Sequence, residues 1–165
     1  MTSTTENPTS KEILGPALGK LSSGVYIVTH THDNDKEGML ATWIIQAAFE
    51  PPMLTVSIQK ERHFLSKLQK GVRFTVNAIS KKNMDIFKAF ARPHKEGEDR
   101  FAELKLADKK AAGAVFADAL SYLDCVVKDQ MEAGDHVVVL AEVVGGGLLN
   151  EDEAMLHTRK NGFQY

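Results

Sequence analysis

The fold of this chain is decided by residues 120–147, LSYLDCVVKDQMEAGDHVVVLAEVVGGG, where two apolar stretches flank a short polar turn. Valine, leucine and tyrosine recur in both stretches, which is typical of β-strands. We expect strands at residues 120–130 and 135–144, with residues 131–134 as the loop of a hairpin. Two strands joined by so short a connection pair antiparallel, so the stretch predicts an antiparallel sheet.

Strand patterns continue on both sides of this hairpin. Further strands are expected at residues 24–30, 38–44, 53–59 and 73–79, with a last short strand that ends near Thr158. Short helices are expected at residues 63–71 and 81–91. Because the strands come as adjacent hairpins, the sequence predicts a mostly β antiparallel barrel or sandwich with a few peripheral helices.

Length and composition fit one compact domain. The chain has 165 residues, of which 43% are apolar and 25% charged, and its formal net charge is −2. This balance predicts neither a nucleic-acid partner nor a membrane partner. We expect a flexible tail at residues 1–12 and one domain at residues 13–165. The single cysteine, Cys125, favours a reducing, cytoplasmic setting.

Several residues that form functional motifs in other proteins lack the spacing of those motifs here. The glycines at 145–147 lack the spacing of a dinucleotide-binding loop, so we expect a bulge or bend in a strand there. Cys125 lies inside an apolar stretch and is interpreted as a small core residue. His30 and His32 stand two apart in a turn and are interpreted as solvated. No metal site is predicted, because the histidines form no zinc motif.

Small and hydrogen-bonding residues around Trp43 form the first candidate for a ligand site. Ala41 and Thr42 precede the tryptophan, and residues 46–48 follow it. Small side chains let a flat ligand approach the backbone, and hydroxyl and amide groups supply the few polar contacts that such a pocket needs.

A second candidate follows the strand expected at residues 53–59. Ser57, Gln59, Lys60 and Arg62 combine a hydroxyl, an amide and two cations with the N–H groups of a turn. Such a set suits a phosphate. On residue types alone, a solvated turn is the simpler interpretation of the same residues.

Taken in order, these pieces resemble the flavin reductase family with the FMN-binding split-barrel fold. The resemblance is carried by GMLATWIIQAAFEPPMLTVSIQK, FTVNAI, the FKAF and DRF segments, YLDCVV, GDHVVVLAEV and a closing Arg-x-x-Gly that precedes Tyr165. It runs from about Leu18 to Tyr165. Residues 41–53, ATWIIQAAFEPPM, are especially similar to the flavin reductase-like module of the flavodiiron proteins of oxygenic phototrophs.

The resemblance implies a six-stranded Greek-key barrel, a homodimer, and FMN or FAD held near the dimer interface, with NAD(P)H as co-substrate. The residues implied to line the flavin ring and ribityl chain are Met39, Leu40, Ala41, Thr42, Gln46, Ala47 and Ala48. Those implied to meet and close the phosphate end are Ser57, Gln59, Lys60, Arg62, His63 and Phe64. Asn77 would buttress the site, and Arg159 and Tyr165 would complete its rim.

His136 matches the Gly-Asp-His histidine of the family, which implies a place near the nicotinamide and the flavin. On this hypothesis NAD(P)H passes hydride to the flavin, and His136 positions the nicotinamide or stabilises the reduced flavin. The residues leave a structural histidine bonded to Asp135 open as an alternative. Two further alternatives are a flavin-binding electron-transfer or redox-sensing module without reductase activity, and a haem-binding or purely structural barrel.

The sequence departs from the family pattern at two places. Residues 43–45, Trp-Ile-Ile, stand where many relatives have serine- or threonine-rich runs, which implies a weaker or differently placed polar grip on the flavin. The spacing from Arg159 to Tyr165 is one residue longer than the compact form.

The resemblance specifies the electron acceptor and the choice between NADH and NADPH less closely than it specifies the flavin. Reduced flavin would leave for a partner oxygenase or pass electrons to another acceptor. Lys81, Lys82, Arg92 and Lys95 lie in expected loops and are candidates to meet the additional phosphate of NADPH, although solvated loop residues are the more common case.

Overall fold

The computed structural model describes residues 10–165, which divide into two compact units. One unit comprises Gly24–Met155, and the other the described residues up to Ser23 together with Leu156–Tyr165. Residues 1–9 of the expected tail lie outside the described residues, and helix α1 (Lys11–Leu18) begins two residues before the expected start of the domain. No helix in the described range is long and apolar enough to cross a membrane.

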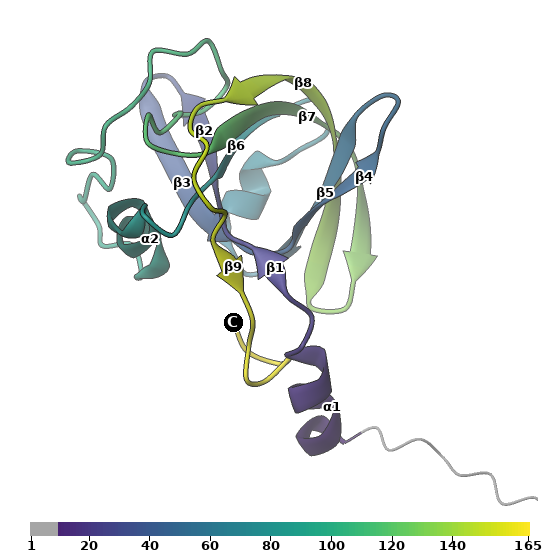
Figure 1. The fold of residues 1–165 in the computed structure, drawn as a ribbon. Helices are drawn as coiled ribbons and strands as arrows, with labels where there is room; N and C mark the ends of the chain where they lie inside the picture. The colour runs from purple at the N-terminus through teal and green to yellow at the C-terminus, as the bar shows by residue number, and fades with distance from the viewer. Residues whose placement is uncertain (1–9) are drawn as a thin grey trace, which may run out of the picture. The chain divides into compact units, whose positions relative to one another are not determined.

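The larger unit is built on an antiparallel sheet whose strands follow the order β3-β2-β6-β7-β8-β5-β4 (Figure 1). The strands are β2 (Tyr26–His32), β3 (Asp35–Ala41), β4 (Ile44–Ala48), β5 (Met53–Gln59), β6 (Arg73–Ala78), β7 (Ser121–Ala133) and β8 (His136–Leu148). The described residues also hold the 3-10 helix η1 (His63–Lys67) and helix α2 (Met84–Ala91). The prediction of an antiparallel, mostly β fold with peripheral helices is confirmed.

The sheet has seven strands within residues 10–165, one more than the six-stranded barrel that the resemblance implies, because one expected strand is divided. Residues 38–44 were predicted as a single strand, but β3 ends at Ala41 and β4 begins at Ile44. Thr42 and Trp43 separate the two, and β4 pairs with β5 instead of continuing the hairpin with β2. The break brings the Trp43 backbone against β5, where its carbonyl accepts a hydrogen bond from the Ser57 N–H at 3.0 Å.

The two main hairpin turns are tighter than the sequence predicts. Asp33 and Asn34 alone connect β2 to β3, with φ of 47° and 66°. Gly134 and Asp135 alone connect β7 to β8, and the φ of 62° at Gly134 is typical of the first position of a type II′ turn. The expected loop at residues 131–134 is therefore mostly strand. This turn places His136 at the first position of β8.

The interior of the barrel is apolar and draws on every strand from β5 to β8 as well as β2, β3 and η1. Its buried residues are Val28, Ala41, Leu54, Val56, Ile58, Phe64, Leu68, Phe74, Val76, Cys125, Val127, Val137, Val139 and Ala141. Cys125 is fully buried there, as expected of a core residue, and burial raises the pKa of its thiol to about 12. At this pKa the thiol stays protonated near neutrality.

The glycines at the end of β8 lie beside a β-bulge, as the sequence predicts. Asp124 is opposite Gly145 and Cys125 is opposite Val143, which leaves Val144 as the additional residue. Gly146 has φ of 140°, and a Cβ at this position would clash with the carbonyl oxygen of Tyr122. Residues 145–147 thus belong to a bent strand, and their role is structural.

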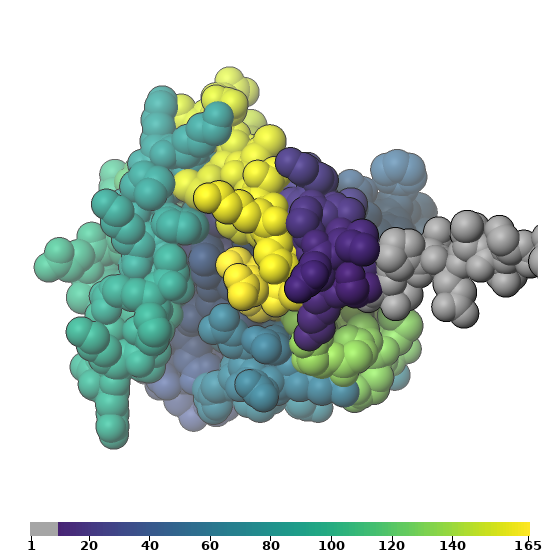
Figure 2. Space-filling view, turned by 90° about the horizontal axis from the view of Figure 1, so that it is seen from below, coloured from purple at the N-terminus to yellow at the C-terminus, as the bar shows by residue number. Residues whose placement is uncertain are grey.

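A second layer covers the outer face of β2, β3 and β6. Ring contacts join Phe90 of α2 to Phe101 and Phe116, and these pack with Ile27 and Ile79 in a second apolar cluster. In Figure 1, α2 lies beside β3. In Figure 2 the teal residues that follow α2 form the surface at the left of the view.

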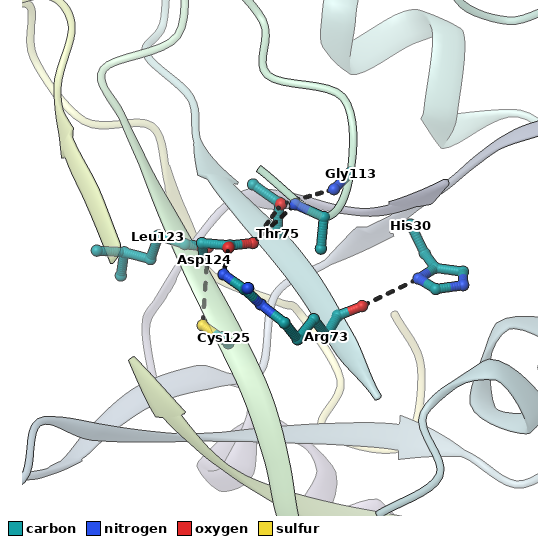
Figure 3. A network of polar contacts seen from close by, with 8 residues as sticks. His30, Arg73, Thr75, Gly113, Leu123, Asp124 and Cys125 are labelled. Carbon is teal, nitrogen blue, oxygen red and sulfur yellow. Dashed lines mark hydrogen bonds and ion pairs between the residues drawn. The ribbon is translucent and has the colours of Figure 1, made fainter. Parts of the chain in front are cut away.

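The buried carboxylate of Asp124 attaches residues 112–113 to the barrel (Figure 3). Asp124 is 2% exposed and forms an ion pair with Arg73. Its Oδ1 accepts hydrogen bonds from Thr75 Oγ1 at 3.1 Å and from the Ala112 N–H at 2.9 Å. Thr75 Oγ1 in turn accepts from the Gly113 N–H at 2.9 Å. The network holds residues 112–113 over β6 and β7, on the side of the barrel away from β5.

Candidate functional site

The outer face of β5 and β8 carries the polar residues that the sequence singled out. Leu54, Val56 and Ile58 of β5 face the interior, so the alternating residues Ser57 and Gln59 face outward. Residues directly opposite in antiparallel strands share a face, and Gln59 lies opposite His136. The structure therefore brings Ser57, which was predicted for the phosphate end, and His136, which was predicted for the nicotinamide, onto one face of the sheet.

His136 is held from two sides. Its residue is 8% exposed, and its Nδ1 lies 2.6 Å from Asp135 Oδ1. Since a carboxylate only accepts hydrogen bonds, Nδ1 is the donor. The imidazole also lies against Trp43, with ring centroids 4.8 Å apart and an angle of 35° between the planes. The carboxylate and the indole together fix the orientation of the imidazole.

Lys60 joins the same cluster through its backbone and its side chain. The Lys60 N–H donates to the carbonyl of Asp135 at 3.0 Å, which ties the end of β5 to the turn before β8. Its ammonium forms an ion pair with Glu132, whose side chain is 77% exposed. We call Trp43, Ser57, Gln59, Lys60, Asp135 and His136 the His136 group.

Thr42 adds a buried hydroxyl to this region. Its Oγ1 is buried and has no hydrogen-bond partner within residues 10–165. A buried hydroxyl without a partner costs about 1–3 kcal/mol. This cost would be relieved if a ligand beside Trp43 supplied a donor or acceptor.

The predicted residues of β3 do not share one face. Met39 and Ala41 pack with the barrel interior, and Leu40 packs with the second apolar cluster. Their side chains alternate across the strand, so only one of the two sets can point toward a common ligand. In β4, Gln46 and Ala47 are exposed and Ala48 is half-buried, and the Gln46 amide donates to the Ala48 carbonyl at 3.2 Å.

Two predicted residues have structural roles instead of places in the His136 group. Phe64 is 6% exposed and packs in the barrel interior, whereas Arg62 and His63 beside it are exposed. Asn77 is fully buried in β6. Its amide donates to the Ala114 carbonyl at 3.1 Å and accepts from the Phe116 N–H at 3.1 Å. Asn77 therefore buttresses the segment over β6 and not the His136 group.

Arg159 and Tyr165 belong to the smaller unit. That unit also holds α1 and β9 (Leu156–His157), whereas β1 (Ser23–Gly24), the partner strand of β9, ends on the first residue of the larger unit. The Arg159 guanidinium donates to the carbonyls of Gly162 and Gln164 at 3.1 and 3.2 Å, which closes the terminal turn. Their predicted place on the rim of the site stays a prediction.

The contact that sequence reasoning missed is the one between Trp43 and His136. Trp43 was expected as a departure from a polar run and not as a site residue. The available signal was the isolated indole between two strand patterns, but nothing in the spacing of residues 43 and 136 indicates that their rings meet. The contact depends on the break between β3 and β4.

A separate apolar pocket is lined by residues of β2, β4, β5, β6, β7 and β8. Its volume is about 320 Å³, and its lining includes Tyr26, Ile44, Leu123 and Val143. Burial raises the pKa of the Tyr26 hydroxyl. Ser57, Gln59 and His136 do not line it, so the pocket and the His136 group are distinct.

Comparisons with known proteins agree with this geometry. A family model described as a flavin reductase like domain matches residues 18–164. Diflavin flavoprotein A 1 of Synechocystis sp. (strain ATCC 27184 / PCC 6803 / Kazusa) is 38% identical over 154 residues, which are 92% of this chain and 27% of that protein. The chain thus spans about a quarter of the length of this curated relative.

Solved structures share the fold. The NADH:FAD oxidoreductase SgcE6 of Streptomyces globisporus C-1027 matches with a TM-score of 0.81 and 23% identity, over 93% of this chain and 91% of that one. The flavin reductase HpaC, solved in complex with NADP+, matches with a TM-score of 0.75 and 21% identity, over 92% and 95%. The antiparallel barrel is thus that of flavin reductase structures.

Proposed function

The chain belongs to the family of flavin reductase like domains, and from this premise we propose that it is an NAD(P)H:flavin reductase that binds FMN against the His136 group. One observation carries the proposal. In a chain of this family, a buried histidine oriented by a carboxylate and an indole shares a sheet face with Ser57 and Gln59. FAD is the alternative flavin.

The residues present fit a flavin mononucleotide. The Ser57 hydroxyl and the Lys60 ammonium suit the phosphate, and the exposed Glu132 that now pairs with Lys60 is a weak competitor for it. The buried, unpartnered Oγ1 of Thr42 suits a polar edge of the ring or the ribityl chain. The indole of Trp43 offers an aromatic surface for a flat ligand.

The chain's own residues then orient and polarise the reactants. A bound flavin supplies the ring that accepts hydride from NAD(P)H. Asp135 holds the Nδ1 proton of His136, so Nε2 accepts in the neutral imidazole and donates in the protonated one. The protonated imidazole would present an Nε2–H donor to negative charge on a reduced ring, and it would need little reorganisation because Trp43 already restrains the imidazole.

Replacement of Thr42 by valine tests the flavin site. Without its hydroxyl the chain loses a contact with FMN, and we expect the Kd for FMN to rise about five- to tenfold. The flavin-free protein should melt at the same or a higher temperature, because a buried unpartnered hydroxyl is removed. Fluorescence titration with FMN and thermal melts of the flavin-free protein measure both. Thr31→Val, on the exposed end of β2, is the matched control; unchanged FMN affinity in Thr42→Val would contradict the placement.

We also propose that the chain forms a homodimer. Ile45 of the edge strand β4 is 71% exposed, and Phe49, in the turn that follows, is 89% exposed. An apolar edge strand favours pairing with another chain. Sedimentation equilibrium should give twice the mass of the chain, and Phe49→Asp should reduce it to the single mass. A wild-type protein that is monomeric at all concentrations would oppose this assembly.

The acceptor of the reduced flavin and the cytoplasmic setting stay predictions. Because the chain spans about a quarter of its curated relative, the electron route of the larger protein is not carried over.

A further inference from the structure

The apolar pocket lies at one end of the barrel, where three neighbouring strands begin or end. β2 begins at Tyr26, β6 ends at Ala78, and β7 begins at Ser121. Tyr26 lies opposite Ala78, and Ala78 lies opposite Ser121. Residues opposite each other in antiparallel strands share a face, so these three side chains form one row along the wall of the pocket.

The small residue in the middle of this row leaves the hollow. Paired strands lie about 5 Å apart, so the Cα atoms of Tyr26 and Ser121 are about 10 Å apart, with only the methyl group of Ala78 between them. Val76 and Leu123, each two residues further inward on its strand, supply an apolar floor that belongs to the barrel interior. The hollow therefore combines an apolar base with a row that is polar at both ends.

Two residues of the lining carry hydroxyl groups that form no hydrogen bond within residues 10–165. They are Tyr26 and Ser121, both half-buried. Burial raises the pKa of the Tyr26 hydroxyl, so the phenol is protonated near neutrality and can donate. Gly24 leaves room for this phenol, because a Cβ at that position would clash with the Tyr26 hydroxyl. Both hydroxyls are thus available to a ligand.

The charges around the pocket favour a neutral ligand. Among the described residues that line it, none carries a charged side chain. The carboxylates next to the lining along β7 and β8 are paired, Asp124 with Arg73 and Glu142 with Lys128. Glu50, two residues before Pro52 of the lining, is exposed and adds negative charge on this side. An anion would lose hydration here and gain no opposite charge in return.

The volume of about 320 Å³ sets the size of the ligand. An apolar cavity of about 150 Å³ holds one benzene ring, so this pocket has room for about two rings. Its volume also falls at the lower end of the range for small-molecule sites, about 300–1,000 Å³. The ring of Tyr26 and the thioether of Met53, both in the lining, are groups that make favourable contacts with an aromatic ligand.

We propose that this pocket is a binding site for a neutral aromatic compound of about two rings that carries one hydroxyl or carbonyl group. The rings would pack on Val76 and Leu123, and the polar group would bond to the hydroxyl of Tyr26 or Ser121. The site is distinct from the His136 group, so the inference goes beyond the proposed reductase and does not depend on it.

The test uses 2-naphthol as the probe, with calorimetry of the protein saturated with FMN and of the flavin-free protein. We expect a Kd of about 100 µM or tighter in both, as suits a ligand of this size. 2-Naphthoate has the same rings but is an anion at neutral pH, and it should bind at least tenfold more weakly. The double variant Tyr26→Phe/Ser121→Ala should weaken 2-naphthol at least fivefold, the loss of one hydrogen bond. Ala78→Leu, which fills the hollow, should abolish binding.

Tyr122→Phe is the matched control, because it removes a hydroxyl from the next residue of β7, which does not line the pocket. It should leave the Kd for 2-naphthol within twofold. Thermal melts establish that each variant folds, and if Ala78→Leu does not, the double variant decides, since it removes only the two hydroxyl groups. Failure of 2-naphthol to bind the wild-type protein, or equal binding by the double variant, would overturn the proposal.

Two further outcomes would reassign the pocket and so overturn the proposal. Displacement of 2-naphthol by FMN would make the pocket part of the flavin site. Binding by Phe49→Asp but not by the wild-type protein would mean that a second copy of the chain covers the pocket. A protein that binds 2-naphthol as expected but takes up no flavin would contradict the reductase proposal and leave this site in place.

Discussion

Replacement of His136 by alanine should slow the reduction of bound flavin by NAD(P)H about 10²-fold, which is the usual loss when one fixed hydrogen-bond donor is removed. The His136 side chain is 11% exposed and restrained by Asp135 and Trp43, so it is oriented before a ligand arrives. Affinity for FMN should change less than fivefold, because Ser57, Lys60 and Thr42 remain. Anaerobic stopped-flow absorbance at saturating flavin measures the rate.

An asparagine variant separates the roles of the two nitrogens of the imidazole. Asparagine can keep the hydrogen bond that Nδ1 donates to Asp135, while it loses the group at Nε2. If Nε2 acts on the reactants, His136→Asn should be as slow as His136→Ala. His32→Ala, at the exposed end of β2 beside Asp33, is the control and should reduce at the wild-type rate. A wild-type rate in His136→Ala would leave the histidine with a structural role only.

Replacement of Asp124 by alanine should lower the free energy of unfolding by about 2–4 kcal/mol, because the Thr75 hydroxyl and the Ala112 N–H lose a charged acceptor at about 1–3 kcal/mol each, while the Arg73 guanidinium is 56% exposed and stays solvated. Asp124 is 2% exposed and satisfies Arg73, Thr75 and the Ala112 N–H at once (Figure 3). Without it, a buried hydroxyl and a backbone N–H lose their partner, and residues 112–113 lose their attachment to the barrel. Urea unfolding followed by circular dichroism gives the free energy.

An exposed ion pair is the matched control for this effect. Glu153 is 77% exposed and pairs with Lys81 at 2.8 Å. Glu153→Ala should cost about 1 kcal/mol or less, because solvent screens exposed pairs. Similar losses for both variants would mean that the Asp124 network contributes no more than a surface contact.

The hairpins could be predicted from sequence because their signals are local. The apolar residues 137–139 and Gly134 indicate a hairpin of β7 and β8 from local sequence, although the loop expected at residues 131–134 is mostly strand. The break at Thr42 and Trp43 could not be predicted, since residues 38–44 have the composition of one strand. β4 instead forms a hairpin with the next strand, β5, and the composition of residues 38–44 does not show where β3 ends and this hairpin begins.

The candidate site was predicted only in part, because residue types do not reveal sheet register or packing. Ser57, Gln59 and His136 were named from residue types and from the family resemblance, and sheet register brings them to one face. Side chains alternate between the two faces of β3, so Leu40 lies on the opposite face from Met39 and Ala41. The buried roles of Phe64 and Asn77 follow from the packing of η1 and of the segment 114–116, which residue type does not reveal.

The central claim is that the chain binds flavin beside His136 and reduces it with a nicotinamide nucleotide. The most direct measurement is an anaerobic titration of the FMN-loaded protein, and in parallel of the FAD-loaded protein, with NADPH and NADH. The account predicts that the visible absorbance of the flavin bleaches stoichiometrically, at a rate that His136→Ala lowers about 10²-fold. Flavin that binds tightly but stays oxidised with both nucleotides would contradict the account and identify a flavin-binding module that receives its electrons from elsewhere.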